Sequence, residues 1–217
     1  NKLSNLQLVG TYETKNDYWA YYRLSKSEYF TWRTAQCNQA IAQALNLLYE
    51  YDSSTSNIAS GITSLLKGLE LIVDYTDMDL TTSYQNRQIN LYNELFFRLN
   101  RIPETLNVEF ATMEMEIVAK QRERKTIELI ANYKNEAKVY PCKIFPVCFN
   151  FKSGKGEIVS KTLTDENGKA ELIINRITSF SSPQFIEANP DKGFWLNGVE
   201  NSVVKSMFDN LQFVPAT

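Results

Sequence analysis

Histidine is absent from this chain of 217 residues. Its absence removes the side chain that most often acts as a general base near neutral pH and that most often ligates zinc. Basic residues are not in excess either, because the formal net charge is −2. Nucleic-acid-binding proteins carry a basic surface that contacts phosphates. The composition therefore argues against histidine-based catalysis, against a histidine zinc site and against a nucleic-acid partner.

Cysteine is scarce and odd in number, with Cys37, Cys142 and Cys148 alone. Three cysteines cannot all pair within one chain. Cys142 and Cys148 belong to one extended segment, which places them about 20 Å apart at roughly 3.3 Å per residue, beyond disulfide reach. We therefore expect buried free thiols, with redox chemistry or a bridge between copies as alternatives.

Long apolar runs are missing as well. No stretch is long enough to span a membrane as a helix, and no signal peptide is recognisable. The sequence begins at Asn1 without a methionine. We therefore expect that a leader or further upstream sequence has been removed.

The stretch from Leu24 to Tyr51 organises the chain and predicts one long amphipathic helix. Ser25 and Glu28 have the spacing of a capping box, in which each side chain bonds a free N–H of the first turn. Glycine and proline are absent from the stretch. A helix with so long an apolar stripe needs a partner surface. The stripe runs in steps of four and three: Phe30, Thr34, Cys37, Ile41, Ala44, Leu48 and Tyr51.

An aromatic β-hairpin is predicted just before this helix, with strands 5–13 and 18–24 and the turn sequence TKND. The second strand, YWAYYRL, alternates so that Tyr18 and Tyr22 share one face and Trp19 and Tyr21 the other. We expect one face to pack on the long helix. The other needs later helices, missing N-terminal sequence or a partner. Tyr18, Trp19, Tyr21 and Tyr22 are therefore the candidate interaction surface, against the alternative that all are core aromatics.

Two further helices are predicted in the first half of the chain. A polar link at 52–57 leads into an apolar pattern that begins at Ile58, and the shortness of the link makes the first two helices antiparallel. A third helix is expected from Tyr84 to Ile102, ended by Pro103. Together with the hairpin, these helices form a predicted antiparallel helical bundle over residues 1–102.

After Pro103 the apolar period changes to two, which is typical of strands. We expect strands at 108–118, where Met113, Met115 and Ile117 alternate with glutamates, and at 126–133, joined by a solvated basic tip; one helix through 111–134 is the alternative. An asparagine- and glycine-containing turn, TDENG, is expected at 164–168. The further predicted strands are 145–151, 157–163, 169–177, 184–188 and 211–216, with a helical segment at 200–209. Short strands with such turns predict an immunoglobulin-like β-sandwich over residues 105–217.

Motifs of known chemistry are incomplete in this sequence. Ser64 and Lys67 match S-x-x-K, but S-D-N and K-T-G are lacking and the segment is helix-patterned. Asp74, Asp77 and Asp79 lack the spacing of a calcium loop, so we expect them to be solvated. Trp19, Trp32 and Trp195 leave sugar stacking open as an alternative. No catalytic, cofactor-binding or metal-binding residue is therefore assigned.

Two segments resemble known families. Residues 18–32, YWAYYRLSKSEYFTW, with the helix that follows, resemble the closing strand and helix of the Lpp-twenty family of bacterial outer-membrane lipoproteins over residues 5–50. The matching residues are Tyr22, Arg23, Leu24, Ser25, Lys26, Glu28 and Tyr29. Separately, PVCFNF at 146–151 with TLTDENGKAEL at 162–172 resembles bacterial immunoglobulin-like domains, a pattern that marks fold and not function.

These resemblances imply a cell-envelope lipoprotein held in the outer membrane only through a lipid on a cysteine upstream of residue 1. The fold class expected is α+β, with domains 1–102 and 105–217. We expect a non-enzymatic interaction or assembly module with a protein partner in the envelope and without a cofactor. The alternatives are a surface glycan-binding module and, less favoured, a hydrolase that uses carboxylates alone.

Overall fold

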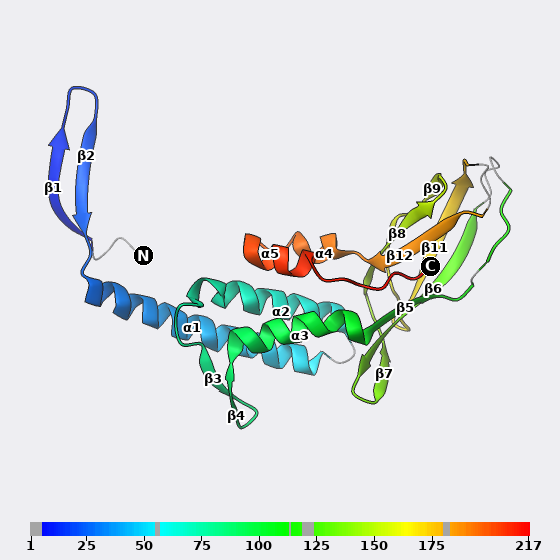
Figure 1. Cartoon of the computed structure of the whole chain (residues 1–217), viewed down its shortest axis with the longest axis horizontal. Helices are drawn as coiled ribbons and strands as arrows, with labels where there is room; N and C mark the ends of the chain where they lie inside the picture. Colours follow the sequence, from blue (N-terminus) through cyan, green and yellow to red (C-terminus); the bar gives the residue numbers. More distant parts are fainter. Residues whose placement is uncertain (1–5, 55–56, 113, 119–123, 180–182) are drawn as a thin grey trace.

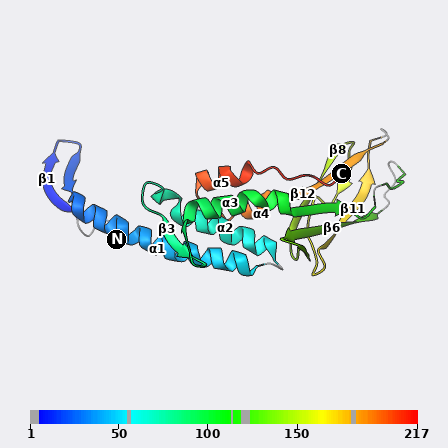
Figure 2. The same cartoon turned by 60° about the horizontal axis from the view of Figure 1, so that its bottom comes forward.

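The computed structural model describes the chain except residues 1–5, 55–56, 113, 119–123 and 180–182. It is a mixed α+β protein with an N-terminal β-hairpin. The molecule is elongated (Figure 1): the hairpin lies at one end, the long helices in the middle and the larger sheets at the other end. The same order is visible when the molecule is turned (Figure 2).

Helix α1, Lys26–Ser53, is the predicted long helix, but only part of its stripe is covered. Its buried residues begin at Cys37 and continue through Ala40, Ala44 and Leu48. Phe30, the first residue of the predicted stripe, is 62% exposed. The predicted capping box is wrong, because Ser25 occupies the N-cap position without bonding a backbone N–H, and its hydroxyl lies 2.9 Å from that of Ser27.

Helix α2, Ile58–Ile72, is the most deeply buried helix among the described elements. Ten of its fifteen residues are buried. The apolar face of α2 is wide, and only a narrow stripe that contains Ser60 and Lys67 is exposed. Such a helix needs partners on several sides, and α2 contacts α1, α3 (Leu91–Thr105) and α5 (Ser202–Asp209). Gly68 makes the close approach possible, because a Cβ there would lie 3.2 Å from a methyl of Leu95. Asn57 caps α2 by accepting from the Ser60 N–H.

The predicted third helix begins seven residues late. Residues 84–90 belong instead to a small hairpin, β3 (Thr81–Tyr84) and β4 (Arg87–Asn90). Gln85 and Asn86 form its two-residue turn with φ values of 47° and 62°, the conformation that suits tight hairpins. At the other end, Pro103 does not stop α3, which ends two residues later at Thr105.

A polar network holds the β3–β4 hairpin against the helices. The Asp52 carboxylate, at the end of α1, accepts from the Tyr84 hydroxyl and the Arg98 guanidinium, and the Gln85 amide donates to it at 3.0 Å. Arg98 also donates to Glu94 at 2.8 Å. The carboxylates of Asp52 and Glu94 therefore both face the Arg98 guanidinium group, as expected for a structural ion pair.

The strands of the second half form two sheets. The first has five strands in the order β5-β6-β11-β9, with β7 also on β6; the second has the order β10-β8-β12. Every pairing is antiparallel. Phe110 of the first sheet and Phe149 of the second stack with ring centroids 6.3 Å apart. The strands are β5 (Leu106–Phe110), β6 (Lys125–Asn135), β7 (Lys138–Pro141), β8 (Pro146–Ser153), β9 (Gly156–Ile158), β10 (Lys161–Leu163), β11 (Lys169–Ile177) and β12 (Phe185–Pro190).

Several predicted strands change in extent or partner. The strand expected at 108–118 ends at Phe110, and Met115 and Ile117 lie in irregular chain. Met113 and most of the basic tip lie outside the described residues. The segment 157–163 is divided, because β9 joins β11 and β10 joins β8. The segment 211–216 contributes only an isolated bridge from Ala216 to Ala188.

The predicted TDENG turn is present, although the strands on either side of it belong to different sheets. The Asp165 carboxylate accepts from the N–H groups of Lys169 and Asn167, each at 2.8 Å. The Lys169 N–H contributes most to holding the pKa of Asp165 below its usual value. Gly168 has φ +75°, a conformation that costs a residue with a Cβ more than glycine.

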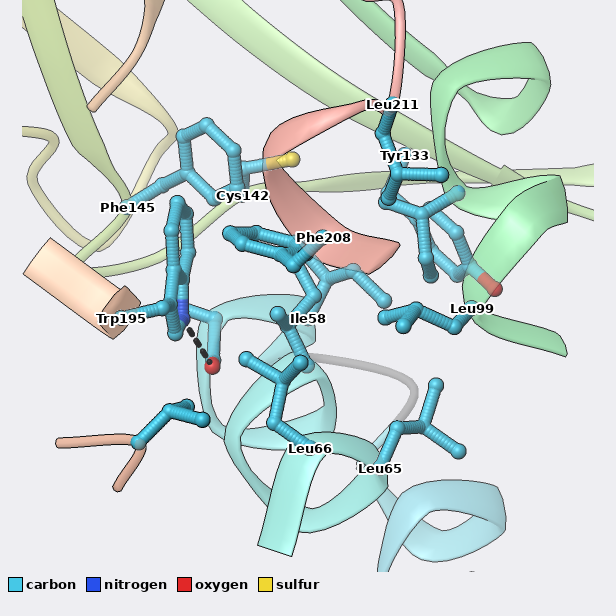
Figure 3. Close-up of a cluster of buried hydrophobic side chains, with 14 of the residues drawn as sticks. Ile58, Leu65, Leu66, Leu99, Tyr133, Cys142, Phe145, Trp195, Phe208 and Leu211 are labelled. Atoms are coloured by element: carbon cyan, nitrogen blue, oxygen red, sulfur yellow. Dashed lines mark hydrogen bonds between the residues drawn. The ribbon is translucent and has the colours of Figure 1, made fainter. Parts of the chain in front are cut away.

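The chain returns from the sheets to the helices through α4 (Lys192–Leu196) and α5, and α4 was not predicted. Trp195 lies buried among Phe145, Phe208 and the start of α2 (Figure 3), and its indole N–H donates to the Ala59 carbonyl at 3.0 Å. The Glu70 carboxylate accepts from the N–H groups before α5. Buried side chains form one cluster from α1 to the sheets. The boundary between the two predicted domains, at residues 102–105, therefore stays a prediction. α4 and α5 follow this boundary in the chain, and both contact α2, which precedes it.

The position of Trp195 predicts that the helices and sheets lose stability together. Trp195→Ala is expected to lower the free energy of unfolding by about 3–5 kcal/mol through the cavity it leaves. Trp195→Phe keeps most of the ring and should cost about 1 kcal/mol, because the Ala59 carbonyl loses one donor but still accepts from the Thr63 hydroxyl at 3.1 Å. Denaturant unfolding followed by circular dichroism measures both. The exposed Phe97→Ser is the control, and an unchanged midpoint for Trp195→Ala would contradict this role.

Candidate functional site

The N-terminal hairpin, β1 (Gln7–Glu13) and β2 (Tyr18–Arg23), stands away from the rest of the molecule (Figure 1). Every residue of both strands is exposed. An isolated two-stranded hairpin is only marginally stable in water. We call residues 7–23 the aromatic hairpin, and it is the candidate functional site.

The strand register assigns the side chains of the aromatic hairpin to two faces. Tyr12 lies opposite Trp19, and Gly10 lies opposite Tyr21. On the other face, Leu8 pairs with Tyr22 and Glu13 with Tyr18. Directly opposed residues point to the same side of a sheet. Each face therefore carries two aromatic side chains of β2 and an apolar residue of β1.

The expectation that one face packs on the long helix is wrong. The four predicted residues, Tyr18, Trp19, Tyr21 and Tyr22, are 51–66% exposed. Helix α1 leaves from the end of β2 and runs away from the hairpin instead of passing beneath it (Figures 1 and 2). The structure thus brings the four residues together on one element and leaves both of its faces to solvent.

Local contacts shape the hairpin itself. The turn is closed by Thr14, whose N–H donates to the Asp17 carbonyl at 2.8 Å and whose hydroxyl accepts from the Asp17 N–H at 2.9 Å. Arg23 donates to the Gln7 side chain at 3.1 Å across the open end. A bulge at Val9 shifts the register of β1. These bonds define the hairpin's shape but cover none of its aromatic rings.

Sequence reasoning missed three apolar residues that extend the site. Tyr12 could have been found by counting back from the TKND turn, which places it opposite Trp19. Leu8 could not, because the bulge at Val9 changes its partner. In the first turns of α1, Phe30 is 62% exposed and its ring lies 6.0 Å from that of the partly exposed Tyr29.

An ion pair marks the place where α1 meets the other helices. Arg33 donates to the Asp77 carboxylate at 2.6 Å and to the Asp74 carbonyl at 3.0 Å, and it lies over the Tyr75 ring. This bond lowers the pKa of Asp77 and raises that of Arg33. Asp79 accepts from Thr81, which lowers the pKa of its carboxyl group. Asp74, Asp77 and Asp79 are exposed, as expected, although Asp77 also forms an ion pair and Asp79 accepts from the Thr81 N–H.

The other residues considered from the sequence do not gather at the hairpin. Ser64 is buried in α2 and donates to Glu50 at 3.2 Å. Trp195 is buried, so the three tryptophans do not share an exposed surface. Among the described residues, no group of three or more acidic, cysteine or histidine side chains is arranged to hold a metal ion.

The three cysteines are free, as predicted. Cys37 and Cys142 are buried and Cys148 is half-buried. Burial raises the pKa of all three thiols, to about 12 for Cys142. Because the thiolate is the reactive form, burial disfavours redox chemistry at these positions.

A second feature of the surface is a wide, shallow hollow beside the link between α1 and α2. Two of its serines bond the backbone of α1, with the Ser54 hydroxyl donating to the Glu50 carbonyl at 2.6 Å and that of Ser53 to the Tyr49 carbonyl at 2.9 Å. Such an open, internally bonded surface is a weaker candidate than the aromatic hairpin. The lining residues are Asn46, Tyr49, Glu50, Ser53, Ser54 and Ser60.

Within the described residues, none of the helices combines the length and the apolar character needed to cross a bilayer. No family model, curated protein or solved structure matches the chain, so the aromatic hairpin is the feature from which its function is inferred.

Proposed function

We propose that this chain is a non-enzymatic interaction or assembly module of the bacterial cell envelope and that the aromatic hairpin is its working surface. One observation carries the proposal: Tyr18, Trp19, Tyr21 and Tyr22 are 51–66% exposed on both faces of an element that stands apart from the core. Large apolar patches on a soluble surface mark sites where another molecule binds.

The chemistry of these side chains suits a protein partner. Tyrosine and tryptophan are enriched at the centres of protein interfaces, because they combine a large apolar area with a polar group at the edge. A few such residues supply most of the binding energy of an interface. Leu8, Val9 and Phe30 add apolar area beside them, each at least 50% exposed.

The envelope location rests on the resemblance of residues 18–32 to the Lpp-twenty lipoproteins, with a lipid on a cysteine upstream of residue 1. The finer fold belongs to the same proposal: residues 1–102 form the hairpin and an antiparallel helical bundle, and residues 105–217 an immunoglobulin-like sandwich. The contact between Phe110 and Phe149, one from each sheet, supports packing of the two sheets face to face.

The lipoprotein proposal predicts a lipid on the native mature protein. Intact-mass measurement of protein from membrane and soluble fractions is expected to find the mature form in the membrane fraction, heavier than its amino-acid sequence by an acylated N-terminal cysteine. Two acyl chains are needed for stable anchoring. An unmodified protein in the soluble fraction would contradict the envelope location. The interaction proposal would then rest on the exposed aromatic hairpin alone.

The interaction proposal predicts that aromatic side chains of the hairpin are required for binding. Lys15 lies in the turn of the hairpin and Lys26 at the start of α1, and both are exposed. Amine cross-linking of intact cells should therefore join them to the partner. The double variant Trp19→Ser and Tyr21→Ser is expected to lower the affinity for the partner about 30-fold, equivalent to roughly 2 kcal/mol at an interface centre.

Phe97→Ser is the matched control, because Phe97 is an aromatic residue on α3 with 56% exposure. It should leave the cross-links unchanged. If both variants lose affinity for the partner equally, or if the double variant loses none, the partner binds at another surface.

A surface glycan binder is a second candidate, favoured by one detail of β2. Trp19 and Tyr21 are two residues apart on one exposed strand face, which places them about 6.6 Å apart, close to the width of a sugar ring. Stacking of sugars on such rings should change the fluorescence of Trp19 during titration with envelope oligosaccharides. Trp19→Phe should abolish the change, and a signal that persists in this variant would exclude the hairpin as a glycan site.

A further inference from the structure

We propose that the partner at the free edge of β2 is a second copy of this chain, paired antiparallel about Ala20 to form a four-stranded sheet in the order β1-β2-β2-β1. This inference rests on the proposed function, since it names the occupant of the aromatic hairpin.

The edge of β2 lacks the features that protect exposed strands. The sheet contains only β1 and β2 among the described residues, so each strand has one open edge. Native proteins protect such edges with bulges, proline or charged side chains. β1 has a bulge at Val9 beside Gly10, whereas β2 is regular and its single charged residue, Arg23, lies at the end. Strand addition is therefore expected at β2.

The sequence of β2 and the residue before it is self-complementary about Ala20. Antiparallel pairing with Ala20 on the two-fold axis places Trp19 opposite Tyr21 of the second copy and Tyr18 opposite Tyr22. It also places Asp17 opposite Arg23 of the second copy. By symmetry each of these pairs occurs twice. Aromatic pairs and opposite charges directly across a strand pair are both favourable.

Neighbouring registers lose this match. A shift of one residue places Tyr18 opposite Arg23 and leaves Asp17 opposite Leu24. A shift of two residues places Trp19 opposite Arg23. Only the Ala20 register joins the aromatic residues to one another and the two charges to each other, so the sequence selects it among these alternatives.

The position of the hairpin leaves room for the second copy. β1 and β2 extend beyond the helices at one end of the molecule (Figures 1 and 2). In an antiparallel pair the two α1 helices depart from opposite ends of the shared sheet. The helices and sheets of the two copies therefore lie on different sides of the pairing strands.

A charge-reversal cycle tests the register. Analytical ultracentrifugation of the purified chain over a concentration series should show a species of twice the 25.0 kDa chain mass. Asp17→Arg alone and Arg23→Asp alone each place like charges opposite one another, and each should raise the dissociation constant at least about tenfold. The two substitutions together restore opposite charges and should return it to within about threefold of the unaltered chain.

Cysteine cross-linking tests which edge is used. Ala20→Cys lies on the proposed axis and should form a disulfide between copies under mild oxidation. Thr11→Cys is the matched control, because Thr11 is equally part of the exposed hairpin and lies opposite Ala20 within one copy. In the proposed sheet the two Thr11 positions are about 14 Å apart, three strand spacings of roughly 4.8 Å, beyond disulfide reach.

The outcomes separate this inference from the proposed function. A monomer at all concentrations, or a dimer that forms disulfides through Thr11→Cys and not Ala20→Cys, overturns pairing at β2. If Lys15 and Lys26 still cross-link to a different protein and Trp19→Ser with Tyr21→Ser removes that cross-link, the interaction function stands without the second copy. If neither assay responds to the hairpin, both proposals are wrong.

Discussion

The structure depends on the covering of α2. With Ile58, Ile62, Leu65 and Leu69 buried and only a stripe that contains Ser60 and Lys67 exposed, this helix is stable only if several elements cover its wide apolar face. α1 and α3 cover part of it, and α4 and α5 return from the sheets to cover the rest. The hydrogen bond from Trp195 to the Ala59 carbonyl, and those from the N–H groups before α5 to the Glu70 carboxylate, hold α4 and α5 against α2. The helices and sheets are therefore joined by packing as well as by the chain.

The difference in length between α1 and α2 explains the exposed hairpin. α1 has 28 residues and α2 has 15, so at 1.5 Å per residue they extend about 42 Å and 22 Å. The two helices are antiparallel and meet at the short link, so the excess of α1 lies at its N-terminal end. Arg33 and its bonds to the Asp74 carbonyl and the Asp77 carboxylate mark where the contacts begin. Among the described residues, no helix lies beside the part of α1 that precedes this point (Figures 1 and 2).

Local patterns predicted the elements better than their partners. The long helix, the N-terminal hairpin, the second helix and the 164–168 turn follow from periodicity and turn chemistry, because these depend on nearby residues. The β3–β4 hairpin was missed because Tyr84 and Ile89, the only apolar residues of 84–90, were assigned to the start of the helix that follows. The backbone at Gln85 and Asn86, with positive φ, forms a hairpin turn instead. The division of 157–163 between two sheets depends on distant strands and leaves no local signal.

The candidate site shows the same limit. Alternation placed Tyr18 with Tyr22 and Trp19 with Tyr21 on opposite faces, and the register agrees with that assignment. Whether the apolar face of α1 is covered depends on how far α2 extends along it, and the sequence of α1 does not encode this length. The apolar stripe begins at Phe30, whereas burial begins only at Cys37. An apolar stripe that continues beyond the partner helix is therefore informative, because it extends the exposed apolar surface of the aromatic hairpin into the first turns of α1, the region where we propose that a partner binds.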